Sequence, residues 1–266
     1  MRTSRVKAKL KRNEPVLVTT LHLNDASLYE MVSLQGFDAI WLDMEHHGFS
    51  VESAHQLLRA ARVGSSDMLV RPAKGEYMRM CRLLEAGAQG IMYPRCQNAA
   101  EAREVVRWAK FAPQGTRGID WANPDTPYMS LPITEYLRLA NQETFVVIQL
   151  EDQEAVNNAD EIAAVEGVDV LMLGPGDFSI LSGVPCQFDH ELVQNAWKTL
   201  AAAAARHGKH WGGPTFSTTH ARQLLDMGAR FLCHGADIVF LKAAFEKMQN
   251  DFAPLGFTFD NRLRLP

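Results

Sequence analysis

The sequence lacks the features that would mark a membrane, secreted or nucleic-acid-binding protein. Among its 266 residues, no apolar run approaches the roughly 18 to 20 residues that a membrane-spanning helix requires. No hydrophobic stretch follows the basic N-terminal segment MRTSRVKAKLKR, so this segment is not predicted to be a secretory signal. With 27 Lys and Arg against 31 Asp and Glu, the composition gives no basic face for nucleic acid. We therefore expect neither a membrane nor nucleic acid among the partners.

Cysteine is also scarce. The four cysteines, Cys81, Cys96, Cys186 and Cys233, lie far apart and form no C-x-x-C pair. Such spacing is typical of reduced thiols in the core of a cytosolic protein. We therefore expect a cytoplasmic protein.

What the chain does contain is a regular alternation of short apolar segments and amphipathic segments. The apolar segments are apolar nearly throughout, which indicates strands buried on both faces, as in a parallel sheet. Glycine precedes several of them, as in EAGAQGIM, where a helix must end before the next strand. The predicted strands are 15–23, 38–46, 68–72, 90–95, 145–151, 169–174, 210–215 and 231–235. The predicted helices that follow them are 25–35, 50–62, 76–86, 98–110, 152–164, 189–207, 217–228 and 236–250.

Eight βα units favour one fold over its main rival. A doubly wound sheet usually carries a glycine-rich turn after its first strand, and residues 19–25 contain no glycine. We therefore predict an α/β fold, a single (β/α)₈ TIM-barrel domain over residues 1–266 with a catalytic core of about 5–250. An extra helix is expected at the N-terminus and a tail at 252–266. The Pro- and Gly-rich loop 111–131 is long enough to predict a functional or interface role.

Ionisable and polar side chains gather where the predicted strands end. In a barrel, the carboxyl ends of all strands meet at one mouth, where active sites are built. A buried carboxylate or imidazole is costly unless it is paired, hydrogen-bonded or bound to a metal, so this gathering predicts a site. The residues are His22, Asp43, Glu45, His46, His47, Arg71, Arg95, Gln149, Glu151, Asp177 and His234.

Two of these carboxylates suggest a metal site. Glu151 and Asp177 follow the fifth and sixth strands, and two carboxylates aimed at one point are typical ligands of Mg²⁺ or Mn²⁺. In the segment LGPGDFS, Gly174 and Gly176 allow a ligand to approach the backbone, and amides near Gly176 and Asp177 are suited to holding a carboxylate. The alternative is a simple turn in which Asp177 caps a helix.

Two further strand ends suggest acid–base and oxyanion chemistry. Arg71, in the segment VRP, is placed to aim paired donors at an oxyanion, although it could equally pair with a structural carboxylate. Asp43 and His46 are three residues apart, so the carboxylate is placed to orient the imidazole and raise its basicity. The apolar strand segments contain no lysine, which argues against a Schiff-base mechanism.

Six ordered segments resemble a known family. FDAIWLDMEHHGFS, VRP, NAAEAREVVRWAKFAPQGTRG, VIQLED, VEGVDVLMLGPGDFS and GARFLCHGADIVFL resemble the metal-dependent class II pyruvate aldolases of the HpcH/HpaI family, over about residues 5 to 250. The resemblance implies a divalent metal ion (Mg²⁺, Mn²⁺ or Co²⁺) held by Glu151 and Asp177. It also implies that Arg71 holds the keto or enolate oxygen, Gln149 positions the pyruvyl group, and His46 is the general base.

The same resemblance implies an activity and an assembly. The expected reaction cleaves or forms 4-hydroxy-2-oxo acids from pyruvate and an aldehyde, and the expected assembly is a homo-oligomer, a trimer or hexamer with a swapped last helix. Two other activities stay open: a related metal-dependent barrel enzyme that decarboxylates or hydrolyses a 2-oxo acid, and a lyase of CoA esters. A binding scaffold without activity would leave the carboxylate pair and the Asp43–His46 pair without a role.

The chain departs from the family around the acceptor half of the pocket. The family commonly has tryptophan at position 20, a small residue at 22, and aliphatic residues at 214 and 234. This chain has Thr20, His22, Pro214 and His234 instead. Pro214 is therefore predicted to contact the substrate. In the long loop, Asp125 stands where close relatives have an arginine for a distal carboxylate of the acceptor. This replacement predicts that neutral hydroxy-aldehydes are preferred.

Overall fold

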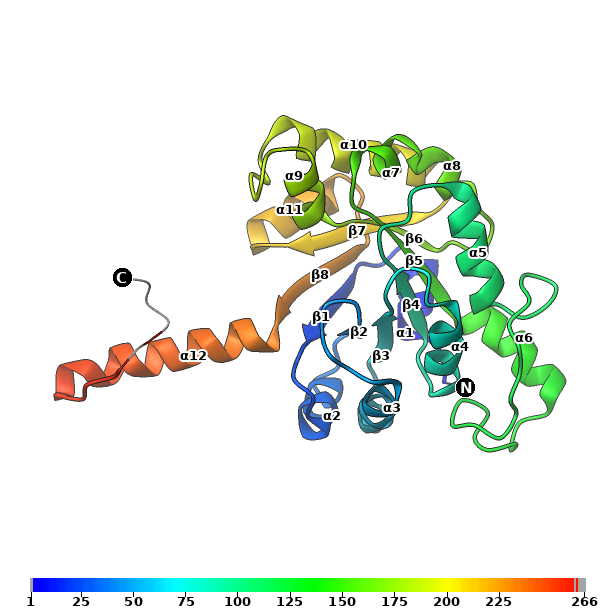
Figure 1. Ribbon diagram of the computed structural model, residues 1–266, viewed down its shortest axis with the longest axis horizontal. Helices are drawn as coiled ribbons and strands as arrows, with labels where there is room; N and C mark the ends of the chain where they lie inside the picture. The colour runs from blue at the N-terminus through cyan, green and yellow to red at the C-terminus, as the bar shows by residue number, and fades with distance from the viewer. Residues whose placement is uncertain (1, 261, 263–266) are drawn as a thin grey trace.

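The computed structural model describes residues 2–260 and 262, and its centre is a closed barrel of eight parallel strands in chain order (Figure 1). This confirms the predicted α/β, (β/α)₈ fold. The strands are β1 (Val16–Leu21), β2 (Ala39–Asp43), β3 (Asp67–Arg71), β4 (Gly90–Tyr93), β5 (Phe145–Leu150), β6 (Val170–Leu173), β7 (His210–Thr215) and β8 (Phe231–Ala236).

Helices surround the barrel, and polar side chains begin many of them. Asp25, Ser50 and Asn98, for example, each accept a hydrogen bond from a backbone amide of the first helical turn. The helices are α1 (Arg5–Lys11), α2 (Ala26–Leu34), α3 (Val51–Ala60), η1 (Ala61–Val63), α4 (Tyr77–Glu85), α5 (Ala99–Ala109), α6 (Ile133–Glu143), α7 (Gln153–Asn157), α8 (Ala159–Ala163), α9 (Pro175–Leu181), α10 (Glu191–Arg206), α11 (Thr218–Asp226), α12 (Asp237–Phe252) and η2 (Ala253–Leu255).

The predicted and observed helices differ in three places. Helix α6 follows the long loop 111–131 and was not predicted. Helix α9 was not predicted, because Pro175 lies between two glycines at its start. The predicted helix 152–164 is divided into α7 and α8 at Asn158, whose backbone leaves the helical conformation.

Two hydrophobic layers hold the barrel. The larger layer lies between the strands and the surrounding helices, and a second cluster fills the barrel interior. Val6 and Leu10 of α1 belong to the interior cluster, so α1 closes the end of the barrel where the strands begin. The buried carboxylate of Asp67 fixes α1 there, because it accepts hydrogen bonds from the Ser4 hydroxyl at 2.6 Å and the Val6 amide at 2.9 Å. The opposite end is left for a site.

Helix α12 runs away from the barrel and does not cover β8 and β1 (Figure 1). It carries the exposed ion pairs Lys242–Glu246 and Lys247–Asp251, and its apolar side chains Val239 and Phe245 are 60% and 57% exposed. On the barrel, Leu17 points outward from β1 and is 43% exposed. The chain thus has a helix with exposed apolar side chains and an uncovered apolar position on the barrel wall.

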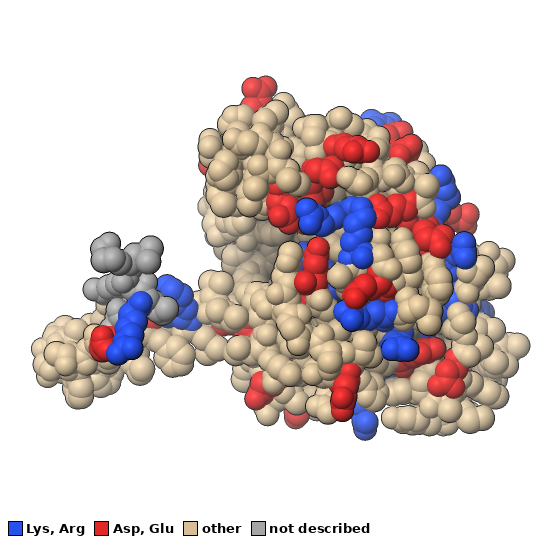
Figure 2. All heavy atoms as spheres, viewed as in Figure 1, with Lys and Arg blue, Asp and Glu red and all other residues tan. Residues whose placement is uncertain are grey.

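The described part of the chain holds no helix with the length and apolarity that crossing a membrane would take. On the face shown in Figure 2, acidic and basic side chains are interspersed.

Candidate active site

Arg71 is the centre of the polar network at the barrel mouth. It is the last residue of β3 and is paired in register with Asp43, the last residue of β2, so both side chains point into the barrel. Both are buried, at 5% and 3% exposure. The Arg71 guanidinium donates to Asp43 Oδ1 at 2.9 Å and Oδ2 at 2.7 Å, and to Gln149 Oε1 at 3.2 Å. It also lies over the ring of Trp41, 4.6 Å from its centre. These contacts fix its plane.

The network continues from Arg71 to the predicted metal ligand Glu151. Gln149 accepts from Arg71 and donates through Nε2 to Glu151 Oε1 at 2.9 Å. The other oxygen of Glu151 accepts the Arg95 backbone amide at 2.9 Å. A Cβ at Gly174 would lie 2.4 Å from Glu151 Oε1, so only glycine leaves room for this carboxylate. The structure thus joins Asp43, Arg71, Gln149 and Glu151, four residues that the sequence predicted at the ends of three strands.

Carboxylates crowd this part of the mouth. Burial raises the pKa of Glu151 to about 7, with Arg71 opposing the shift and the charges of Glu45 and Asp177 adding to it. Burial likewise raises the pKa of Glu45, whose Oε2 is buried without a hydrogen bond and lies 3.3 Å from Arg71 Nε. Asp177 lies in the first turn of α9 but does not cap it, because Gly174 occupies the cap position and no side chain caps this helix. The charges of Glu45 and Asp177 therefore repel that of Glu151 beside Arg71.

This donor set fits a divalent cation. Oxygen ligands with uncompensated negative charge are what Mg²⁺ and Mn²⁺ bind, and a cation would relieve the repulsion at Glu151. Within residues 2–260 and 262, no group of three or more His, Cys, Asp or Glu side chains is arranged to bind a metal. Glu151 and Asp177 would therefore supply two ligands and leave the other positions to water and substrate.

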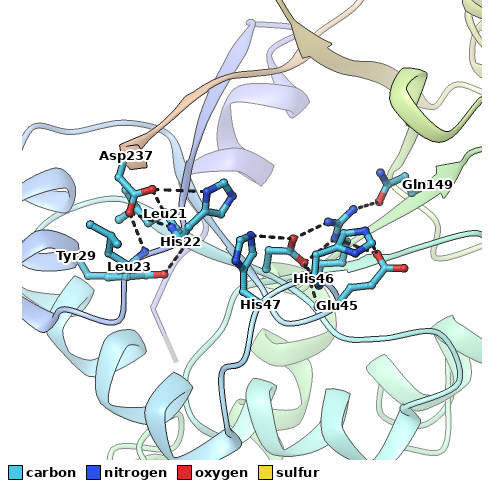
Figure 3. Close-up of polar contacts among 11 residues, drawn as sticks. Leu21, His22, Leu23, Tyr29, Glu45, His46, His47, Gln149 and Asp237 are labelled. Atoms are coloured by element: carbon cyan, nitrogen blue, oxygen red, sulfur yellow. Dashed lines mark hydrogen bonds and ion pairs between the residues drawn. The ribbon is translucent and has the colours of Figure 1, made fainter. Parts of the chain in front are cut away.

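Asp43 has a different partner from the one predicted. Its carboxylate binds Arg71 and reaches His46 only through the backbone amide, at 3.4 Å. A guanidinium in the neighbouring register position offers two parallel donors, which an imidazole cannot match. Burial would raise the pKa of Asp43, but the hydrogen bonds and charge of Arg71 outweigh it and lower the pKa. The His46 ring lies instead 3.6 Å from Glu45, and its side chain is 55% exposed (Figure 3).

A pair of histidines lies on the other side of Asp43. The rings of His22 and His47 are stacked with their centres 4.1 Å apart, and His47 Nε2 is 3.9 Å from Asp43 (Figure 3). Burial and the neighbouring His47 lower the pKa of His22. Asp237, which was not predicted, accepts from the backbone amides of His22 and Leu23 and so joins the ends of β1 and β8. The available signal was an acidic residue at the start of the last predicted helix.

The remaining predicted residues do not join the network. Gly176 is exposed in the first turn of α9, and Pro214 is half-buried in β7 beside Cys233. The placement of Asp125 at the acceptor half is wrong within this chain. Asp125 is 2% exposed, accepts a hydrogen bond from the Tyr136 hydroxyl at 3.0 Å, and donates its amide to Glu85 at the end of α4. Since α4 runs back from the mouth, its last residue lies at the opposite end of the barrel.

The sequence also matches known proteins. The model of the HpcH/HpaI aldolase/citrate lyase family matches residues 18–244. The chain belongs to this family. Among members of the HpcH/HpaI family, it is 32% identical over 246 residues to the 4-hydroxy-2-oxo-heptane-1,7-dioate aldolase of Escherichia coli, covering 92% of this chain and 94% of that enzyme. It is 30% identical over 223 residues to the 5-keto-4-deoxy-D-glucarate aldolase of Klebsiella pneumoniae, covering 84% of this chain and 86% of that enzyme.

A solved HpcH/HpaI structure has the same fold. The HpcH/HpaI aldolase from Desulfitobacterium hafniense DCB-2 matches with a TM-score of 0.87 and 29% identity, covering 92% of this chain and 95% of that one. These findings confirm the resemblance that the sequence motifs indicated. The chain is an enzyme of the aldolase and lyase class.

Proposed function

We propose that this HpcH/HpaI enzyme is a divalent-metal-dependent class II aldolase that cleaves or forms 4-hydroxy-2-oxo acids from pyruvate and an aldehyde. The observation that carries the proposal is the buried Arg71, held in one orientation by Asp43 and Gln149 beside the carboxylate Glu151. A fixed cation next to a hard-metal site is what the charge of a pyruvate enolate requires. The relatives named as aldolases support the same reaction class.

Arg71 has donors left for a substrate. A guanidinium carries five N–H groups. Three of them are directed at Asp43 and Gln149, which leaves one on each terminal nitrogen. These two would donate to the C2 oxygen of the substrate, where negative charge develops as the carbon–carbon bond breaks. Asp43 and Gln149 act as positioning residues, since they hold the guanidinium without reorganisation during the reaction.

His46 is the proposed base. In the cleavage direction it takes the proton of the 4-hydroxyl, the C3–C4 bond breaks to release the aldehyde, and the electron pair of that bond forms the enolate of pyruvate. The enolate then takes a proton at C3 and leaves as pyruvate. Glu45, 3.6 Å from the His46 ring, would stabilise the imidazolium that forms.

Glu151 and Asp177 are the proposed metal ligands. When bound, a divalent ion would act as a Lewis acid that polarises the substrate's 2-oxo group. The amides of Gly176 and Asp177 have no helical acceptor, because they lie in the first turn of α9, and would hold the pyruvyl carboxylate. Pro214 and Gly174 would line the pocket around the substrate.

We also propose a homo-oligomer, a trimer or hexamer. The support is the apolar surface of α12 together with the exposed Leu17 on the uncovered wall of β1. A second copy of α12 would bury both surfaces. Light scattering of the wild type and of Phe245→Glu tests this, since the variant should shift the assembly to smaller species. A wild-type monomer at micromolar concentration would contradict it.

The direct test of the proposed activity is pyruvate release from a panel of 4-hydroxy-2-oxo acids, with and without a chelator. Release of pyruvate and an aldehyde in equal amounts, lost on chelation and restored by Mg²⁺, Mn²⁺ or Co²⁺, is expected. Carbon dioxide from a 2-oxo acid without an aldehyde product would indicate a decarboxylase instead. Cleavage of a CoA ester alone would indicate a CoA-ester lyase.

A further inference from the structure

Arg95 has an unusual backbone at the mouth. It lies two residues beyond the end of β4 and has a φ of 52°, a left-handed conformation that residues other than glycine rarely adopt. Two contacts hold it there. Its amide donates to Glu151 Oε2 at 2.9 Å, and its carbonyl accepts from Lys74 Nζ at 2.7 Å. A strained backbone tied to a catalytic carboxylate suggests that the direction of the side chain matters.

The guanidinium of Arg95 is exposed and uncommitted. It makes no hydrogen bond or ion pair with any residue in 2–260 or with 262, whereas the neighbouring cations are engaged. Arg71 is bound to Asp43 and Gln149, and Lys74 lies 3.1 Å from Glu101 in addition to its bond with the Arg95 carbonyl. Arg95 therefore keeps all five of its N–H donors for a ligand.

The charge of Arg95 acts on the same part of the mouth as the proposed base. It contributes to lowering the pKa of Glu45, although burial, the largest effect, raises that pKa overall. Glu45 in turn lies 3.6 Å from the His46 ring. Arg95 thus places an uncommitted charge near the Glu45–His46 pair, which the substrate hydroxyl would meet.

We propose that Arg95 is a specificity-determining residue that binds an anionic group, a carboxylate or a phosphate, on the aldehyde half of the substrate. The inference rests on the proposed aldolase function, because it assigns the acceptor end of that reaction. It also replaces the prediction from Asp125. Since Asp125 is buried at the other end of the barrel, it does not repel an anionic acceptor within this chain.

The test compares charged and neutral acceptors of matched shape in the aldol direction, with pyruvate and saturating Mg²⁺ or Mn²⁺. Succinic semialdehyde is paired with its methyl ester, and glyceraldehyde 3-phosphate with glyceraldehyde. The variants are Arg95→Met and Arg95→Lys, with Arg103→Met, an exposed arginine on α5, as the control. For at least one pair, Arg95→Met should lower the charged-to-neutral ratio of kcat/KM by about 10- to 100-fold, because hydrogen bonds to a charged group are lost.

Further outcomes identify the ligand or overturn the proposal. The pair with the larger drop distinguishes a carboxylate from a phosphate. Arg95→Lys should keep part of the ratio, and Arg103→Met should not move it. If Arg95→Met leaves the charged-to-neutral ratio of kcat/KM unchanged in both pairs, or only raises the KM of pyruvate, Arg95 does not bind the acceptor. If the wild type neither exchanges the methyl protons of pyruvate nor uses any acceptor, it is the aldolase function that fails.

Discussion

The Asp43–Arg71 pair gives the sharpest prediction about how the site is held. Asp43→Asn keeps the shape of the side chain but removes the charge that accepts two hydrogen bonds from Arg71, at 2.9 and 2.7 Å. Breaking a buried ion pair typically costs about 3–5 kcal/mol. Glu45 at 3.3 Å and Gln149 remain as partners of the guanidinium, so we expect a smaller loss of about 2–4 kcal/mol.

Two assays follow the Asp43→Asn variant. For a chain of this size, the expected loss corresponds to a decrease in Tm of about 4–16 °C. With Arg71 no longer fixed, kcat for aldol cleavage should fall by about 10²-fold, and enolisation of pyruvate should fall with it. The control is Asp160→Asn, which breaks an exposed ion pair with Arg206 of similar length, 2.6 Å, and should change neither quantity. Wild-type Tm and activity in Asp43→Asn would refute the positioning role of Asp43.

Three further predictions concern the metal site, the glycine beside it and the closed end of the barrel. Asp177→Asn should lower metal affinity and turnover by orders of magnitude while the circular dichroism spectrum stays native, and unchanged metal binding in a titration would contradict this. Gly174→Ala should lower metal affinity as well, because its Cβ would lie 2.4 Å from Glu151 Oε1, and an equally active variant would show that this contact is unimportant. At Asp67, burial raises the pKa from 3.8 to about 6, opposed by hydrogen bonds from Ser4 and backbone amides and by the charge of Arg2. Its stability contribution should therefore be larger at pH 5 than at pH 7.5, by about 1.4 kcal/mol, because only the folded state takes up the proton in this window. Urea unfolding should show this difference in the wild type and not in Asp67→Asn, and parallel pH profiles for the two proteins would argue against it.

The sequence predicted the barrel because its signals are local. Each strand is a short apolar run between helical segments, and this pattern can be recognised without knowledge of tertiary contacts. Helix α6 was missed since it directly follows a Pro- and Gly-rich loop and has Pro132 at its N-cap, without a capping side chain. Helix α9 was missed because Gly174, Pro175 and Gly176 are typical of turns.

The sequence predicted which residues form the candidate site but not which of them pair with one another. Strand ends of a parallel barrel meet at one mouth, so Asp43, Arg71, Gln149 and Glu151 could be grouped from sequence alone. The hydrogen bonds between them depend on strand register, which places Arg71 beside Asp43. His46 lies beside Glu45 instead. Placing Asp125 would have needed its contact with Tyr136, a tertiary contact that no spacing reveals.

The central claim is that the chain stabilises the enolate of pyruvate through Arg71 at a metal site. Exchange of the pyruvate methyl protons with deuterium, followed by NMR, measures this without any aldehyde. The account predicts exchange in the metal-loaded wild type, loss of exchange after chelation, and a decrease of about 10²- to 10³-fold or more in Arg71→Ala. Exchange at the wild-type rate in metal-free protein or in Arg71→Ala would contradict it.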